Sequence, residues 1–292
     1  MYMTPKEIKE VLKDLGAEPN KRLGQHFLID PHVLETIVQT AEPAKIGISF
    51  EIGPGLGVLT RALLQQGHHI IALERDTRFI QYLKNSIQHE NFKLITGDAT
   101  DIDWSKYLKN SWSLISNLPY AISSFALRTA LYNPNPAAHI VVLVQREVGE
   151  RAISVAGEMK HSKHENKTSL LSLMVALASS HARIVKRVSQ QAFYPAPKVE
   201  SVVLEIIPMS HKEREKKWGI QPEKIMHIAK TGFAHPRKKL SSNLTAGLGL
   251  SKEFIADAFT RTQLNQNIRA EDVSPRDWAM LASCLDESVK IL

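Results

Sequence analysis

Residues 48–57 read ISFEIGPGLG, a short apolar run that ends in three closely spaced glycines. The run predicts a buried strand, and the glycines predict a turn from which a helix begins at about residue 57. Glycine at such a turn lets the backbone approach a ligand closely, although a tight turn without any ligand is an alternative explanation. Because a dinucleotide fingerprint requires glycine where Val58 stands, the turn favours a nucleoside site without a pyrophosphate.

Similar apolar runs recur along the chain and alternate with helical stretches. We expect strands at 48–53, 69–74, 92–98, 113–118 and 139–145, and helices at 6–15, 31–41, 57–66, 76–88 and 122–132. This alternation predicts a mostly parallel sheet with helices on both faces. Two further runs, 182–188 and 201–208, lie too close together for a helical crossover, so we expect them to form an antiparallel pair at the sheet edge.

The composition changes after Pro208, where the chain becomes strongly charged and loses the strand pattern. We therefore expect a sheet domain with an N-terminal helical extension over 1–208. A small helical domain over 209–292 should follow, interrupted at Gly247, Gly249 and Asn265. The predicted fold class is α/β, a Rossmann-like sheet followed by a C-terminal helical domain.

Positive charge is concentrated in the second half of the chain, which carries a net charge of +8 against −1 in the first half, giving the protein's total of +7. Residues 1–150 hold 15 Lys+Arg and 16 Asp+Glu, whereas residues 151–292 hold 22 and 14. The tract 209–250 alone has 9 basic and 3 acidic residues, with Arg237, Lys238 and Lys239 in succession. This tract predicts a polyanion-binding surface, although a basic face that only maintains solubility is the simpler alternative.

Other features of the sequence argue for a cytoplasmic protein. Cys284 is the single cysteine, so no disulfide can form within the chain. No run of about 18 apolar residues is present, and the N-terminus lacks the apolar segment of a signal peptide. The histidines at 68, 69, 161 and 164 lack metal-ligand context, so we expect no metal site.

Acidic residues stand at the ends of the second and third predicted strands. Glu74 lies 21 residues after Gly53, where a carboxylate can accept hydrogen bonds from both hydroxyls of a ribose. Asp98 ends the third strand, where a carboxylate can accept from the exocyclic amine of adenine. Because the carboxyl ends of neighbouring parallel strands meet at one edge of a sheet, these groups should converge on one crevice.

The fourth predicted strand runs into Asn117-Leu118-Pro119-Tyr120. An adenine amine is a weak nucleophile, and the Asn117 side-chain oxygen and the Leu118 carbonyl are suitable acceptors for its hydrogens. Pro119 stiffens the turn, and Tyr120 offers a face on which an extruded base can stack. Positioning the amine in line with a methyl donor would then supply most of the catalysis. An ordinary Asn-x-Pro turn is the alternative.

In these motifs the chain resembles the bacterial 16S rRNA adenine dimethyltransferases, the KsgA/RsmA family, over about residues 20–283. The motifs that carry the resemblance are KRLGQHFL (21–28), EIGPG (51–55), Glu74, GDA (97–99), NLPY (117–120), QREV (145–148), AFYPAPKV (192–199), FAHPRKKLSSNL (233–244) and IRAE (268–271). The resemblance implies that up to four methyl groups pass from S-adenosylmethionine to two adjacent adenosines near the 3′ end of 16S rRNA, in small ribosomal subunit biogenesis. We also expect the protein to act as a monomer.

The resemblance also implies roles for individual residues. Cofactor contacts are implied at His26, Leu28, Gly53, Glu74, Asp98 and Asn117. A target-base pocket is implied at Asn117, Leu118, Pro119, Tyr120 and Phe193, in which the Phe193 ring sandwiches the base. Two departures from the family pattern are His26, where asparagine is usual, and the segment HENKTSLLSL (164–173), where a glycine-lysine-x-tyrosine pattern is usual.

Three other functions compete with this interpretation. The related family that methylates one adenine in 23S rRNA shares the cofactor motifs, but FAHPRKKLSSNL favours the small-subunit enzyme. A ribosome-assembly factor that binds RNA is compatible with catalysis rather than exclusive of it. A nicotinamide oxidoreductase is disfavoured by Val58 and by the NLPY tetrapeptide.

Overall fold

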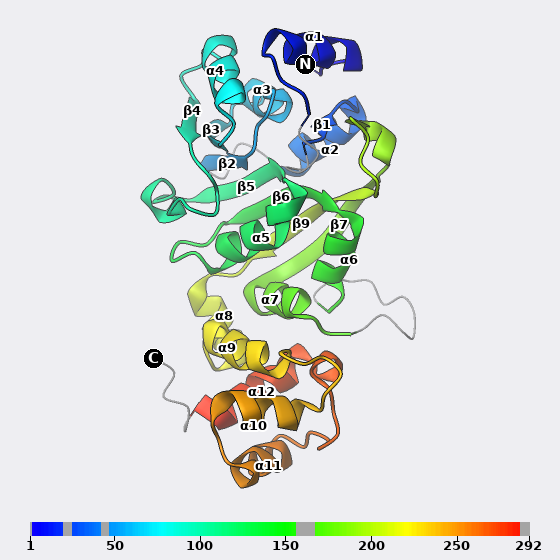
Figure 1. Cartoon of the computed structure of the whole chain (residues 1–292). Helices are drawn as coiled ribbons and strands as arrows, with labels where there is room; N and C mark the ends of the chain where they lie inside the picture. The colour runs from blue at the N-terminus through cyan, green and yellow to red at the C-terminus, as the bar shows by residue number, and fades with distance from the viewer. Residues whose placement is uncertain (1, 20–24, 42–46, 156–166, 287–292) are drawn as a thin grey trace. The chain divides into compact units, whose positions relative to one another are not determined.

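The computed structural model describes residues 2–19, 25–41, 47–155 and 167–286 (Figure 1). The chain divides into two compact units, one comprising Met1–Glu150 with Arg183–Pro208 and the other Arg151–Ala182 with Met209–Leu292. The first unit contains the sheet except for residues 179–182, and the second is mainly helical around its own core.

The first unit is built on a seven-stranded sheet in the order β4-β3-β2-β5-β6-β9-β7 (Figure 1). Its strands are β2 (Ile48–Ile52), β3 (His69–Glu74), β4 (Phe92–Thr96), β5 (Trp112–Asn117), β6 (His139–Gln145), β7 (Ser179–Val188) and β9 (Ser201–Pro208). The first five run parallel to one another, and β9 pairs antiparallel with β6. The fold class and each strand predicted from an apolar run are confirmed, with ends shifted by up to three residues.

Several helices of the first unit begin at a side-chain cap that the sequence supplies. The helices are α1 (Pro5–Asp14), α2 (Pro31–Ala41), α3 (Val58–Gln65), α4 (Thr77–Ser86), α5 (Ser123–Tyr132) and α6 (Arg146–Ile153). Thr4 forms a capping box with Glu7, and the Asp30 side chain accepts from the N–H groups of the first turn of α2. Short 3-10 helices lie at η3 (Trp104–Lys106), η4 (Tyr120–Ile122) and η5 (Gln190–Ala192).

A second, two-stranded sheet joins segments that are far apart in the sequence. Strand β1 (Phe27–Leu28) pairs antiparallel with β8 (Phe193–Tyr194), with Phe27 opposite Tyr194 and Leu28 opposite Phe193. These two-residue strands were not predicted, because two residues are too short to show a period in the sequence. The pairing holds the N-terminal segment beside the chain that leads into β9.

The second unit contains α7 (Leu170–Ala178), α8 (His211–Trp218), α9 (Pro222–Gly232), α10 (Leu240–Leu248), α11 (Lys252–Arg261), η6 (Ala270–Asp272) and α12 (Pro275–Asp286). Of the predicted breaks, Gly249 is the left-handed residue that ends α10, whereas Gly247 lies inside that helix and does not interrupt it. The expected single boundary at Pro208 needs correction, because 151–182 belongs with the C-terminal helices. Leu173 and Leu177 on α7 share a buried core with Trp278 of α12.

Two features that would indicate other functions are absent from the described part of the chain. There, no helix is long and apolar enough to cross a membrane. Within those same ranges, no three His, Cys, Asp or Glu side chains lie close enough to hold a metal ion.

Candidate active site

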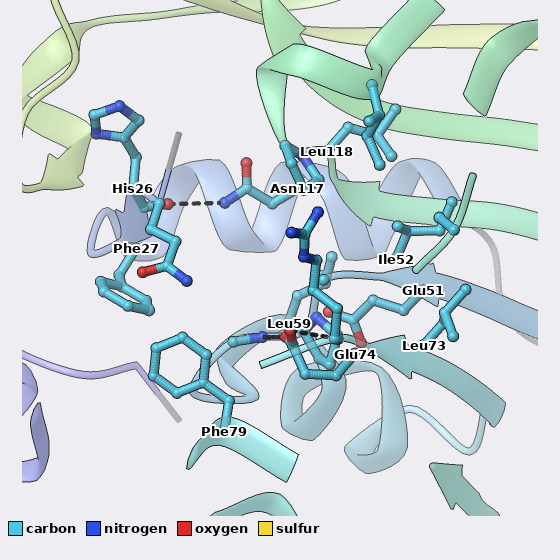
Figure 2. Close-up of a pocket in the computed structure, with 18 of the residues that line it drawn as sticks. His26, Phe27, Glu51, Ile52, Leu59, Leu73, Glu74, Phe79, Asn117 and Leu118 are labelled. Atoms are coloured by element: carbon cyan, nitrogen blue, oxygen red, sulfur yellow. Dashed lines mark hydrogen bonds between the residues drawn. The ribbon is translucent and has the colours of Figure 1, made fainter. Parts of the chain in front are cut away.

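A pocket opens at the carboxyl ends of β2, β3, β4 and β5 (Figure 2). Side chains and backbone from all four strand ends and from β1 line it, including His26, Leu28, Gly53, Glu74, Asp98, Asn117, Leu118, Pro119 and Tyr120. Nine of the ten residues expected from sequence at the cofactor and target-base sites therefore surround one cavity. Of the N-terminal motif, residues 21–24 lie outside the described residues.

The glycine turn after β2 forms one wall of the pocket. Gly53 and Gly55 have φ values of 68° and 56°, in the left-handed region that favours glycine. A Cβ atom on Gly53 would lie 3.2 Å from Cγ of Pro119, and one on Gly55 would lie 3.2 Å from Cε1 of Phe27. Because a side chain would intrude on both flanking walls, glycine here keeps the backbone accessible to a ligand.

Glu74 is buried at the end of β3 and ties the glycine turn to that strand. Its Oε2 accepts from the N–H of Gly55 at 3.1 Å, and its Oε1 accepts from the N–H groups of Arg75 and Asp76 at 2.8 and 2.9 Å. Burial raises the pKa of the Glu74 carboxyl, against the lowering effect of these three hydrogen bonds. The carboxylate thus has a structural role that sequence reasoning did not foresee.

Glu51 is a second buried acid in the pocket, 2% exposed at the end of β2. Burial raises the pKa of its carboxyl to about 8, although Thr60 Oγ1 donates to its Oε2 at 2.6 Å. The carboxyl is therefore mostly protonated at neutral pH. A positively charged ligand group nearby would favour its ionised form again.

Asp98 follows β4, and both of its carboxylate oxygens are engaged. Thr100 donates to Oδ1 from its N–H at 2.9 Å and from its hydroxyl at 2.7 Å, while Arg75 Nη1 donates to Oδ2 at 2.6 Å. The hydrogen bonds from Thr100, with a smaller contribution from the Arg75 charge, lower the pKa of Asp98. Sequence reasoning missed Arg75, which also lines the pocket.

Asn117 is oriented by the backbone of the N-terminal segment. Its Nδ2 donates to the His26 carbonyl oxygen at 3.2 Å, and Figure 2 shows its side-chain oxygen pointing away from that bond. The amide therefore keeps its acceptor atom for another partner. The N–H of Leu118 donates to the Leu143 carbonyl at 3.1 Å, which fixes the NLPY segment against β6.

The His26 side chain lies on the Tyr120 side of the pocket. Its Nδ1 is 2.7 Å from the Pro195 carbonyl oxygen, which can only accept, so Nδ1 carries the proton. The His26 and Tyr120 ring centroids are 5.5 Å apart at an interplanar angle of 30°. His26 stands where asparagine is usual in the family pattern, and its ring thus provides an aromatic neighbour for Tyr120.

The Tyr120 hydroxyl is held by Ser201 at the start of β9, with 2.8 Å between the two oxygens. Burial raises the pKa of Tyr120, so the phenol stays protonated at neutral pH. Ser201 follows AFYPAPKV by two residues and was not among the expected site residues. A serine at the start of a strand has no sequence feature that distinguishes it from other serines.

The structure does not bring Phe193 into the pocket, which corrects the expected pairing of its ring with Tyr120. Phe193 is 3% exposed and packs in the core of the first unit with Leu28 and Val33. Successive residues of a strand point to opposite faces. The next residue, Tyr194, therefore packs on the other side, against the cluster that contains Phe27 and Phe79.

Arg237, Lys238 and Lys239 lie in the second unit, in the turn between α9 and α10, and all three are exposed. Asn243 stabilises this turn, because its Nδ2 donates to the carbonyls of Gly232 at 2.6 Å and His235 at 3.1 Å. The basic residues therefore project from an ordered turn.

The fold and the pocket together define a class of protein. A Rossmann-like sheet carries a glycine turn, a buried glutamate at the second strand end and an aspartate at the third, which fit the methionine-ribose and adenine parts of S-adenosylmethionine. The protein is a methyltransferase, and its methyl donor is S-adenosylmethionine.

Comparison with known proteins gives the family. The model of the family described as ribosomal RNA adenine dimethylase matches residues 16–287, and the chain belongs to that family. A protein of Clostridium botulinum named ribosomal RNA small subunit methyltransferase A is 30% identical over 281 residues, covering 95% of this chain and 98% of its own. A protein of the same name from Dehalococcoides mccartyi is 32% identical over 283 residues, covering 96% and 92%.

Two solved structures have the same fold. A dimethyladenosine transferase from Plasmodium falciparum matches with a TM-score of 0.72 and 22% identity, over 90% of this chain and 98% of its own. The 23S rRNA methyltransferase ErmE matches with a TM-score of 0.60 and 19% identity, over 89% and 99%. These two structures support the fold, while the family match makes the chain an S-adenosylmethionine-dependent rRNA adenine dimethyltransferase, as its sequence motifs predicted.

Proposed function

We propose that this enzyme dimethylates the N6 amines of two adjacent adenosines near the 3′ end of 16S rRNA, within the small ribosomal subunit, and that it acts as a cytoplasmic monomer. The proposed chemistry rests on the geometry of the Asn117 amide. Its nitrogen donates to the His26 carbonyl, while its oxygen remains an acceptor at the pocket. The names of the relatives from Clostridium botulinum and Dehalococcoides mccartyi support the small-subunit substrate.

The pocket residues divide between the two substrates. We assign the cofactor ribose to Glu74, the cofactor adenine amine to Asp98, and the backbone approach to Gly53. His26 and Leu28 form the wall that the N-terminal segment contributes. When bound, S-adenosylmethionine supplies an electrophilic methyl group on a sulfonium.

The target adenine is assigned to the NLPY side of the same pocket. The Asn117 side-chain oxygen and the Leu118 carbonyl accept hydrogens of its amine, which holds the nitrogen in line with the methyl group. Pro119 has no N–H to compete for these acceptors. No general base is needed, because the amine nitrogen becomes cationic when it accepts the methyl group, and that cation is acidic enough to lose its proton to water.

The Tyr120 ring is proposed to stack on the target base, without Phe193. We expect Tyr120→Leu to weaken the productive complex by about 1–3 kcal/mol, the usual worth of base–aromatic stacking. Tyr120→Phe keeps the ring face and loses only the bond to Ser201, at a cost of about 0.5–1.5 kcal/mol. Single-turnover methyl transfer to isolated small subunits measures both.

A Tyr120→Phe variant as slow as the leucine variant would contradict the stacking role, because the hydroxyl rather than the ring face would then matter. Ser201→Ala provides the matched control, since it removes the other partner of the same hydrogen bond. It should resemble Tyr120→Phe.

The basic turn at 237–239 is proposed to contact RNA phosphates. Changing Arg237, Lys238 and Lys239 to glutamine should weaken RNA binding and reduce the slope of log affinity against log salt by up to about two to three. Cofactor affinity should not change, because the pocket is lined by the first unit alone. Filter binding across a salt series measures the slope.

The matched control removes the same charge from the first unit. Lys84, Lys106 and Lys109 are exposed there and can be changed to glutamine together. Equal slopes for the two triple variants and the wild type would mean that the basic turn only maintains solubility.

The substrate itself is tested by incubating the enzyme with labelled S-adenosylmethionine and small subunits from a strain that lacks the modification. We expect label on two adjacent adenosines near the 3′ end, each recovered as dimethyladenosine. Label on a single adenine of 23S rRNA would instead support the competing family, whose fold ErmE shares.

A further inference from the structure

Asp98 holds an ion pair that the proposed cofactor site does not use. Arg75 Nη1 lies 2.6 Å from Asp98 Oδ2, and Arg75 and Asp98 both line the pocket. The other carboxylate oxygen is taken by Thr100. An adenine amine that reaches Asp98 therefore meets a carboxylate that already receives three hydrogen bonds.

The ion pair between Arg75 and Asp98 is in contact with water and can therefore break at little cost in free energy. The Arg75 side chain is 56% exposed and that of Asp98 24% exposed, and a pair in contact with water contributes little net free energy. The Arg75 guanidinium can therefore leave Asp98 and be solvated by water. The neighbouring Arg78 is different, because it forms two hydrogen bonds with Asp76 and does not line the pocket.

We propose that Arg75 competes with the adenine amine of the cofactor for Asp98, and thereby lowers cofactor affinity and speeds release of the demethylated cofactor. The inference rests on the proposed assignment of the adenine to Asp98. As the amine leaves, the guanidinium returns to Oδ2, so the carboxylate is never left unpaired. Such a device suits an enzyme that must exchange its donor several times to complete two dimethylated adenosines.

The test uses the full-length protein and S-adenosylhomocysteine, the demethylated cofactor. Arg75→Met should lower the dissociation constant about two- to fivefold, with a matching decrease in the dissociation rate, since the competing pair is partly solvated. Calorimetry and stopped-flow fluorescence measure the two quantities. Arg75→Lys retains a competing cation and should stay close to wild type.

Salt gives an independent measurement. Because added salt screens an exposed ion pair, the affinity of the wild type for this zwitterionic ligand should rise with ionic strength, while that of Arg75→Met should stay nearly constant. Arg78→Met removes the same charge three residues away and should match the wild type in both experiments.

Weaker or unchanged binding by Arg75→Met, at an unfolding temperature close to that of the wild type, would overturn the proposal. Weaker binding would show that Arg75 contacts the cofactor instead of displacing it. Failure of the wild type itself to bind S-adenosylhomocysteine would be a different result, since it would refute the assignment of the pocket as the cofactor site.

Discussion

Replacement of Asn117 by alanine should reduce the rate of methyl transfer by at least about 10²–10³-fold, the usual effect of deleting one positioned hydrogen-bonding group at a reacting centre. The reason is that the bond from Nδ2 to the His26 carbonyl orients the side-chain oxygen as an acceptor at the pocket, and the alanine variant loses this oxygen. RNA affinity should decrease far less, because most of it comes from phosphate contacts. Single-turnover kinetics with saturating RNA and cofactor separate these effects.

Ser116→Ala is the matched control for this experiment. Ser116 precedes Asn117 on the same strand, is fully buried, and donates to the Ile52 carbonyl at 2.7 Å. Its loss should lower stability without a comparable effect on the transfer step. A single-turnover rate of Asn117→Ala near that of the wild type would refute the role given to the amide.

Glu74→Ala should have the largest effect on the cofactor. Loss of hydrogen bonds from two ribose hydroxyls to a charged acceptor costs about 1.5–3 kcal/mol, or a decrease in affinity of about 10- to 150-fold. The structure adds a second expectation that the sequence alone did not give. Because three backbone N–H groups, including that of Gly55, also lose their acceptor, the free energy of unfolding should fall by about 1–3 kcal/mol.

Calorimetry with S-adenosylmethionine and chemical denaturation measure the two effects of Glu74→Ala separately. Glu74→Gln keeps one acceptor oxygen in nearly the same volume, so it should fall between alanine and the wild type in both. Unchanged cofactor affinity in the alanine variant, despite lower stability, would restrict Glu74 to its structural role.

Most of the fold could be predicted because its elements are long enough to show a period. The five parallel strands appear as apolar runs with helical stretches between them, and one of these helices, α4, begins at the capping residue Asp76. The glycines and acids at the strand ends follow from the parallel topology, which brings those ends to one edge. The cofactor side of the pocket was therefore accessible to sequence reasoning.

What escaped prediction depends on contacts between distant segments. The pairing of β1 with β8 involves only two residues on each side, and it is this pairing that directs Phe193 to the core. The Arg75–Asp98 pair and the Tyr120–Ser201 bond each join residues more than 20 positions apart. Neither contact can be recognised from neighbouring residues in the sequence, because arginines and serines are common throughout the chain.

The packing of α7 with the C-terminal helices determines where chimeras between relatives of this enzyme can be joined. The N–H of Thr168 donates to the Glu271 carbonyl at 2.7 Å, Trp218 Nε1 donates to the Leu177 carbonyl at 2.9 Å, and Leu173 lies in the same core. A chimera joined only after Pro208 would therefore combine the α7 of one parent with the remaining helices of the other, and their side chains would not have been selected to fit. Transplanting the helical unit intact requires three junctions, two at Arg151 and Ala182 on either side of the inserted segment and one at Met209 for the rest.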